Sequence, residues 1–183
     1  MSGYRTRLNW CSRKQCLKAR VPDEFKLWLY DNSSLTAKII DACDKKFRVE
    51  VLSETRTTPT PDEIQLLGLR YRSHAIIRQV LLYCGDKPWV YARSVIPMTT
   101  LIGPLRRLSK LGNKPLGAVL FSNKCITRGA MEVTTLSPDH PCYSWTGNTN
   151  NELIPGRRSV FSLYKRNVLV SEFFLPEIIK NKK

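Results

Sequence analysis

The sequence has few of the residues that would place the protein in several common classes. It carries 15 Asp and Glu against 30 Lys and Arg, and only two histidines, His74 and His140. No apolar run approaches the roughly 20 residues that a membrane-spanning helix requires. The basic N-terminal segment 1–20 has no apolar stretch of the kind found in secretory signals. We therefore expect no integral membrane segment and a cytoplasmic location.

The cysteines show none of the spacings that bind zinc. No CxxC pair occurs, and the two histidines lie far from any cysteine pattern typical of a metal site. Scattered cysteines in a chain long enough to form its own core indicate reduced thiols. We expect no metal site and no cofactor. The six positions are Cys11, Cys16, Cys43, Cys84, Cys125 and Cys142.

The formal net charge of +15 leaves three interpretations open. It can reflect a solvated basic surface, steering of an anionic small molecule, or binding to nucleic acid. The basic residues are spread over the N-terminal segment, residues 87–128 and the C-terminal tail. Aromatic residues do not interleave with them in a recognisable nucleic-acid motif, so we expect no nucleic-acid partner.

The 183 residues fit one domain with one core. There are no internal repeats and no low-complexity linker. We therefore predict a single domain over residues 1–183. It includes the basic N-terminal segment 1–20, a long loop over residues 137–156 and a basic C-terminal tail over residues 177–183.

Periodicity and turn residues predict an α+β fold with a largely antiparallel sheet of about six strands and helices on one face. The clearest feature is a hairpin through Gly85-Asp86-Lys87, and a second hairpin turns at Arg166-Asn167. Pro115-Leu116-Gly117 is expected to be a tight loop. Expected helices cover 22–29, 35–43, 64–67 and 105–111, and expected strands cover 47–51, 74–84, 89–96, 126–135, 159–164 and 168–175.

Two charged residues stand out because their strand neighbours are apolar. Alternate side chains of a strand share a face, so Arg78 lies on the face of Val80 and Glu172 on the face of Val170. A lone charge among apolar side chains costs several kcal/mol unless it is paired or binds something. Either the two residues pair with each other or with backbone groups, or they form an anion-binding arginine and an acid/base carboxylate in one pocket. The pattern alone leaves both interpretations open.

Several long segments resemble the signatures of chorismate pyruvate-lyases. The similarity covers residues 22–176, in order and with plausible spacing, and several ordered signatures are more specific than one short motif. The matching segments are Ile77–Trp89, Arg93–Pro97, Thr100–Pro104, Lys110–Gly117 and Ser171–Pro176.

The resemblance implies a monomeric enzyme that eliminates pyruvate from chorismate to give 4-hydroxybenzoate, the first committed step towards ubiquinone. It also implies a pocket closed by helical flaps. In that family the arginine at the Arg78 position holds the ring carboxylate, and the glutamate at the Glu172 position meets the ring hydroxyl. Backbone groups at the Leu35 and Leu116 positions help to hold the carboxylate end.

This sequence departs from the family at three places. Leu35 stands where the family often has Met, Gln79 stands where relatives often have an acid, and the 137–156 loop is longer. A backbone role at Leu35 tolerates the first change. The loop bears on how the pocket closes.

Two further expectations follow from the resemblance. The product keeps both the carboxylate and the hydroxyl, so product inhibition is expected, with flap opening limiting turnover. The alternative function is a non-enzymatic module that binds small anions, related to the effector domains of bacterial transcription regulators. Such regulators carry a separate helix-turn-helix domain, which the residues before Val21 are too few to form.

Overall fold

The computed structural model describes residues 8–12, 21–122 and 125–180. Most of the basic N-terminal segment and the end of the C-terminal tail therefore lie outside the described residues. None of the helices in the described part is long and apolar enough to cross a membrane. The strands are β1 (Cys11–Ser12), β2 (Phe47–Thr57), β3 (Ala75–Cys84), β4 (Lys87–Pro97), β5 (Thr127–Arg128), β6 (Glu132–Leu136), β7 (Ile154–Leu163) and β8 (Arg166–Phe174).

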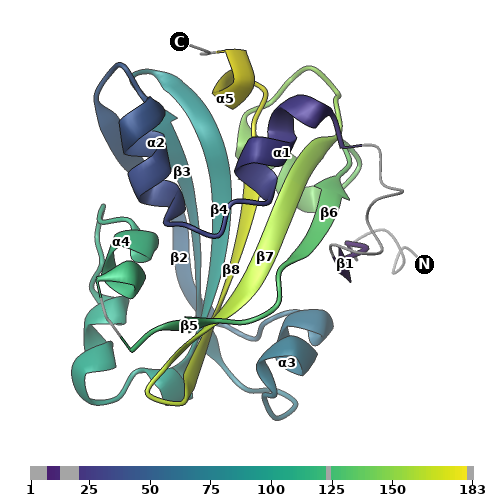
Figure 1. Cartoon of the computed structure of the whole chain (residues 1–183). Coiled ribbons are helices and arrows are strands. Elements are labelled where there is room, and N and C mark those ends of the chain that lie inside the picture. The colour runs from purple at the N-terminus through teal and green to yellow at the C-terminus, as the bar shows by residue number, and fades with distance from the viewer. Residues whose placement is uncertain (1–7, 13–20, 123–124, 181–183) are drawn as a thin grey trace.

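These strands form one antiparallel sheet in a single α+β domain, as predicted. The order is β1-β6-β7-β8-β4-β3-β2, and β5 pairs with β7 beyond the end of β6 (Figure 1). The six longer strands correspond to the expected number, and β1 and β5 add two residues each. Because β8 lies beside β4, the two predicted hairpins become neighbours in the centre of the sheet.

The two hairpins form, although one turn lies elsewhere than expected. β3 and β4 are joined through Gly85, whose φ of 59° is easy for glycine and costly for other residues. The β7–β8 turn is at Tyr164 and Lys165, not at Arg166-Asn167, and both turn residues have positive φ. The expected strand over 126–135 is divided into β5 and β6, and β7 begins at Ile154, inside the expected long loop.

The helices lie on both faces of the sheet, so the expectation of one covered face is wrong. They are α1 (Asp23–Leu29), α2 (Leu35–Ala42), α3 (Pro61–Leu67), α4 (Leu116–Phe121) and α5 (Glu177–Lys180), with 3₁₀ helices η2 (Met98–Thr100), η3 (Gly103–Ser109) and η4 (Pro141–Thr146). Figure 1 shows α1, α2 and α4 over one face. On the other face, Glu63 of α3 binds Arg93, and Tyr143 of η4 joins the cluster of Tyr91 and Phe173.

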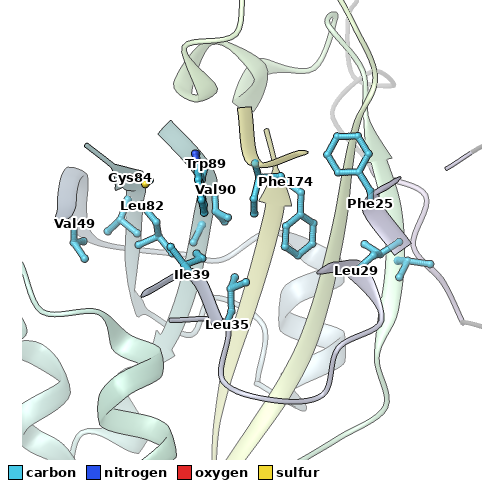
Figure 2. Close-up of a cluster of buried hydrophobic side chains, with 14 of the residues drawn as sticks. Phe25, Leu29, Leu35, Ile39, Val49, Leu82, Cys84, Trp89, Val90 and Phe174 are labelled. Atoms are coloured by element: carbon cyan, nitrogen blue, oxygen red, sulfur yellow. The ribbon is translucent and has the colours of Figure 1, made fainter. Parts of the chain in front are cut away.

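An apolar cluster fixes α1 and α2 on the sheet. Phe25 and Leu29 of α1 and Ile39 of α2 pack against Trp89 and Phe174 (Figure 2). At about 25 cal/mol per Å² of buried apolar surface, such contacts supply the main stabilisation of these short helices. The cluster therefore sets where the N-terminus of α2 lies relative to the centre of the sheet.

One expectation about the cysteines is wrong. Cys43, directly after α2, and Cys84, at the end of β3, form a disulfide. The same two sulfur atoms and the nearby carboxylate of Asp44 are the one cluster in the described residues with the proximity of metal ligands. The two sulfur atoms are bonded to each other, so they are not free thiolate ligands. The disulfide instead connects the C-terminal end of α2 to the sheet.

Candidate active site

A small cavity lies between the sheet and the N-terminal ends of α2 and α4. Its floor is formed by side chains of β3, β4, β7 and β8 that share one face, and its walls are largely apolar. Its volume is about 40 Å³, room for little more than water. The four residues nominated from the sequence all line it: Leu35, Arg78, Leu116 and Glu172.

Arg78 reaches the cavity from the centre of β3 and is almost completely buried, with a side chain 2% exposed. Its Nη1 donates to Glu54 Oε2 at 2.5 Å, and its Nη2 donates to the carbonyls of Gly112 and Lys114. An arginine has five N–H donors. The described part of the chain uses three of them, so two remain for a ligand.

Glu172 has its own partner on the neighbouring strand. Arg157 of β7 lies opposite Glu172 in the register, and its Nε donates to Glu172 Oε2 at 2.6 Å. Arg157 Nη1 also donates to the carbonyls of Trp28 and Asp31, at the end of α1 and just beyond it. The Arg157 side chain is 1% exposed, so this ion pair fixes the Glu172 carboxylate in an environment with little water.

Arg78 and Glu172 are not paired with each other. β4 separates β3 from β8, so the two residues start two strand spacings apart, about 10 Å across the sheet. Arg78 does contact backbone carbonyls, as the structural interpretation of the sequence expected. Its presence in the cavity nevertheless allows the functional interpretation as well.

The two helices above the cavity begin at the nominated leucines. Leu35 is the first residue of α2 and Leu116 the first residue of α4. Backbone N–H groups in the first turn of a helix have no partner within the helix, so both positions offer donors beside the cavity. The two helix starts nearly touch, because a Cβ on Gly117 would lie 3.0 Å from Thr36 Oγ1.

The structure identifies two residues that the sequence did not suggest, Glu54 and Arg157. Glu54 lies beyond the expected strand over 47–51, and Arg157 lies directly after the expected long loop over 137–156. Arg93, by contrast, lies on the opposite face of the sheet, where it forms two hydrogen bonds with Glu63. Its partner and its position away from the cavity give Arg93 a structural role.

The chain is similar to known proteins over most of its length. Residues 6–183 match the family model described as chorismate lyase. The chain belongs to the chorismate lyase family. A relative in Nitrosospira multiformis, named probable chorismate pyruvate-lyase, is 38% identical over 157 residues, covering 84% of this chain and 87% of the relative. A relative of the same name in Methylococcus capsulatus is 38% identical over 154 residues, covering 83% and 94% of the two chains.

Solved structures extend the fold beyond the chorismate lyase family. A transcriptional regulator of the GntR family from Bacillus cereus superposes with a TM-score of 0.56 at 14% identity, covering 73% of this chain and 94% of that chain. At this level of identity the likeness concerns the fold alone.

Proposed function

We propose that the protein is a chorismate pyruvate-lyase that releases pyruvate and 4-hydroxybenzoate, the first committed step towards ubiquinone. The observation that carries the proposal is that Arg78 and Glu172, from separate strands, line one largely apolar cavity. Family membership supports it, since the relatives named above carry the same activity in their names. We further propose that the enzyme is a cytoplasmic monomer that needs no cofactor.

The reaction fits so sparse a site. The C3–O bond of chorismate breaks, its electron pair leaves with the enolpyruvate, and the loss of the C4 proton makes the ring aromatic. Enolpyruvate then becomes pyruvate. Because aromatisation drives the reaction, the protein has mainly to hold the ring in an eliminating geometry and to exclude water.

The residues divide this work between them. Arg78 holds the ring carboxylate with its two remaining N–H donors, aided by backbone N–H groups at Leu35 and Leu116. Glu172 accepts a hydrogen bond from the C4 hydroxyl and takes up the C4 proton as the ring becomes aromatic. Arg157 orients that carboxylate from the side away from the ring.

The closed cavity predicts strong product inhibition. Its 40 Å³ is too small for the ring, so both entry and exit require α2 and α4 to move apart. The product keeps the two groups that Arg78 and Glu172 bind. We expect added 4-hydroxybenzoate to lower the steady-state rate with chorismate, and a burst of one product per enzyme before the slower turnover. Rapid multiple turnover that is unaffected by added product would contradict this.

The experiment that tests the function is incubation of the purified chain with chorismate while pyruvate and 4-hydroxybenzoate are measured. Both products are expected in equal amounts. Arg78→Ala and Glu172→Ala should each reduce the rate by at least about 100-fold, since each removes a charged contact to the substrate. Arg56→Ala, which removes an exposed arginine of β2, is the matched control and should leave the rate unchanged.

An anion-binding module without catalysis is the alternative, favoured only by the likeness in fold to transcriptional regulators. It predicts binding of 4-hydroxybenzoate or chorismate with no release of pyruvate. That result would overturn the proposed enzyme and leave the cavity as a ligand-binding site.

A further inference from the structure

A third arginine lies near the cavity, beyond Glu172. Arg128 belongs to β5 and is paired with Phe161 of β7, so both side chains extend from the same face of the sheet. Its guanidinium carbon lies 5.2 Å from the centre of the Phe161 ring, and Phe161 lines the cavity. Arg128 does not itself line the cavity but contacts Phe161, a residue that does.

Arg128 differs from the other two arginines in its partners. Arg78 is paired with Glu54 and Arg157 with Glu172. Arg128 donates through Nε to Ser159 Oγ at 3.0 Å and through Nη1 to the Asp31 carbonyl at 3.4 Å, both neutral oxygens. Within the described part of the chain, no carboxylate lies within ion-pair distance of it. Burial lowers the pKa of Arg128 and the charge of Arg157 lowers it further, whereas the carboxylates of Glu172 and Asp31, which lie beyond ion-pair distance, raise it by less.

A half-buried guanidinium without an anion is costly, and an anionic ligand would remove that cost. The sheet order fixes where such a ligand must lie. From Arg78 on β3, the chain of neighbours runs through β4 to Glu172 on β8, then through β7 to Arg128 on β5. Across the strands, Arg128 therefore lies past Glu172 on the side away from Arg78. Along the strands its partner Phe161 is opposite Val168, four residues from Glu172.

Chorismate has its second carboxylate in that direction. The enolpyruvyl ether is attached at C3, beside the C4 hydroxyl that meets Glu172 and meta to the carboxylate on Arg78. We propose that Arg128 binds the enolpyruvyl carboxylate and selects substrate over product, because 4-hydroxybenzoate lacks this group. This assignment rests on the proposed function.

The same contact aids the bond cleavage. When the C3–O bond breaks, negative charge develops on the departing enolpyruvate, and a fixed cation beside it stabilises that charge in a space with little water. Arg78 lies at the opposite end of the ring and cannot supply this interaction. Arg128 therefore acts on the leaving group, whereas Arg78 and Glu172 act on the ring.

The test compares two ligands in one variant. In Arg128→Gln we expect kcat/KM for chorismate to fall about 100-fold, because a charged contact to a desolvated carboxylate is lost. The affinity for 4-hydroxybenzoate, measured by calorimetry, should stay within about threefold of the original chain, since a loss below 0.7 kcal/mol is expected where no contact is removed. Arg128→Lys should recover part of the rate, and Arg56→Gln is the control for the loss of one surface charge.

Two results would overturn the proposal. One is an unchanged kcat/KM in Arg128→Gln. The other is an equal loss of affinity for chorismate and 4-hydroxybenzoate together with a lower Tm, which would assign Arg128 a structural role. If the original chain releases no pyruvate at all, the proposed function fails. The affinities of the two ligands still decide the Arg128 assignment in that case, since preferential binding of chorismate that disappears in Arg128→Gln would support it.

Discussion

Each charged residue that faces the ring in the proposed site is neutralised by a partner on an adjacent strand. Glu54 on β2 contacts Arg78, and Arg157 on β7 contacts Glu172. Two buried charges without partners would cost several kcal/mol each. The partners also restrict the rotamers of Arg78 and Glu172, which keeps both groups oriented before a ligand arrives.

Replacement of Arg157 by methionine should be strongly destabilising. It leaves the Glu172 carboxylate buried without a cation, and the loss of one member of a buried pair typically costs about 3–5 kcal/mol. We expect Arg157→Met to lower the free energy of unfolding by about that amount in urea titrations. The double variant Arg157→Met/Glu172→Met should regain most of the stability and have no activity. A single variant as stable as the original chain would show that the pair contributes little.

At this scale the sequence singled out Arg78 and Glu172, which the structure brings to one cavity, and missed their partners, in the case of Glu54 for a physical reason. Strict alternation along β2 would place Glu54 on the face away from Val49 and Val51. The register with β3 shifts between Val51 and Ser53, and this irregularity turns Glu54 towards Arg78. An extra residue in one strand reverses the alternation of side chains beyond it. The local composition of β2 does not indicate the position of this extra residue.

At the scale of elements, the site is covered by two short helices that meet at their N-terminal ends. α2 is fixed to the sheet by the cluster around Ile39, whereas α4 follows the irregular segment after η3. Thr36 and Gly117 are the point of closest approach. A larger side chain there should hold the helices apart.

Gly117→Val is therefore expected to weaken product binding. The added carbon atoms would press on Thr36 Oγ1, and overpacking of this kind costs about 1–3 kcal/mol. We expect the affinity for 4-hydroxybenzoate to fall at least about tenfold and product inhibition to decrease. Thr36→Ala removes Oγ1 and so relieves the clash. The double variant Gly117→Val/Thr36→Ala should therefore bind product more tightly than the single variant Gly117→Val. Equal affinities in the two variants would contradict the contact.

The elements that the sequence predicted well are those with strong local signals. The β3–β4 hairpin has an alternating pattern and a glycine at its turn, and α1 and α2 have polar starts before an apolar face. α4 was missed because Pro115-Leu116-Gly117 has the composition of a turn. In the structure Pro115 precedes the first residue of α4, a position where a fixed φ is compatible with the start of a helix.

At the scale of the whole molecule, the Cys43–Cys84 disulfide closes a long segment of chain. The sequence separation is 41 residues, and the segment contains β2 and α3. Closing such a loop in the unfolded chain is estimated to add about 4 kcal/mol of stability. Sequence spacing could not predict this pair, because it depends on where α2 ends relative to β3.

Removal of the disulfide should lower stability more than removal of an exposed thiol. We expect Cys43→Ser/Cys84→Ser to unfold at lower urea concentration, by about 3–4 kcal/mol in free energy. Cys125→Ser, at an exposed cysteine, is the control and should change it by less than about 0.5 kcal/mol. Indistinguishable midpoints for the paired variant and the original chain would show that the bond adds no net stability.

The fold class of the whole molecule could be predicted from the sequence. The packing of helices on the second face of the sheet could not. Hairpins joined by helical segments indicate an antiparallel α+β fold. The sequences of α3 and η4 do not indicate which face of the sheet these helices cover, because each helix is too short for a clear amphipathic pattern. Their position depends on pairs such as Glu63 with Arg93, which form only when the sheet has assembled.

The contacts of Arg157 connect the orientation of the Glu172 carboxylate to the position of the segment between α1 and α2. One guanidinium orients the Glu172 carboxylate and also holds the Trp28 and Asp31 carbonyls at the end of α1 and in the connection to α2. A displacement of that connection which admits bulk water must stretch these bonds and release the carboxylate. In the proposed mechanism, an opening at this connection would therefore leave the Glu172 carboxylate unaligned, and catalysis would require the connection to be closed.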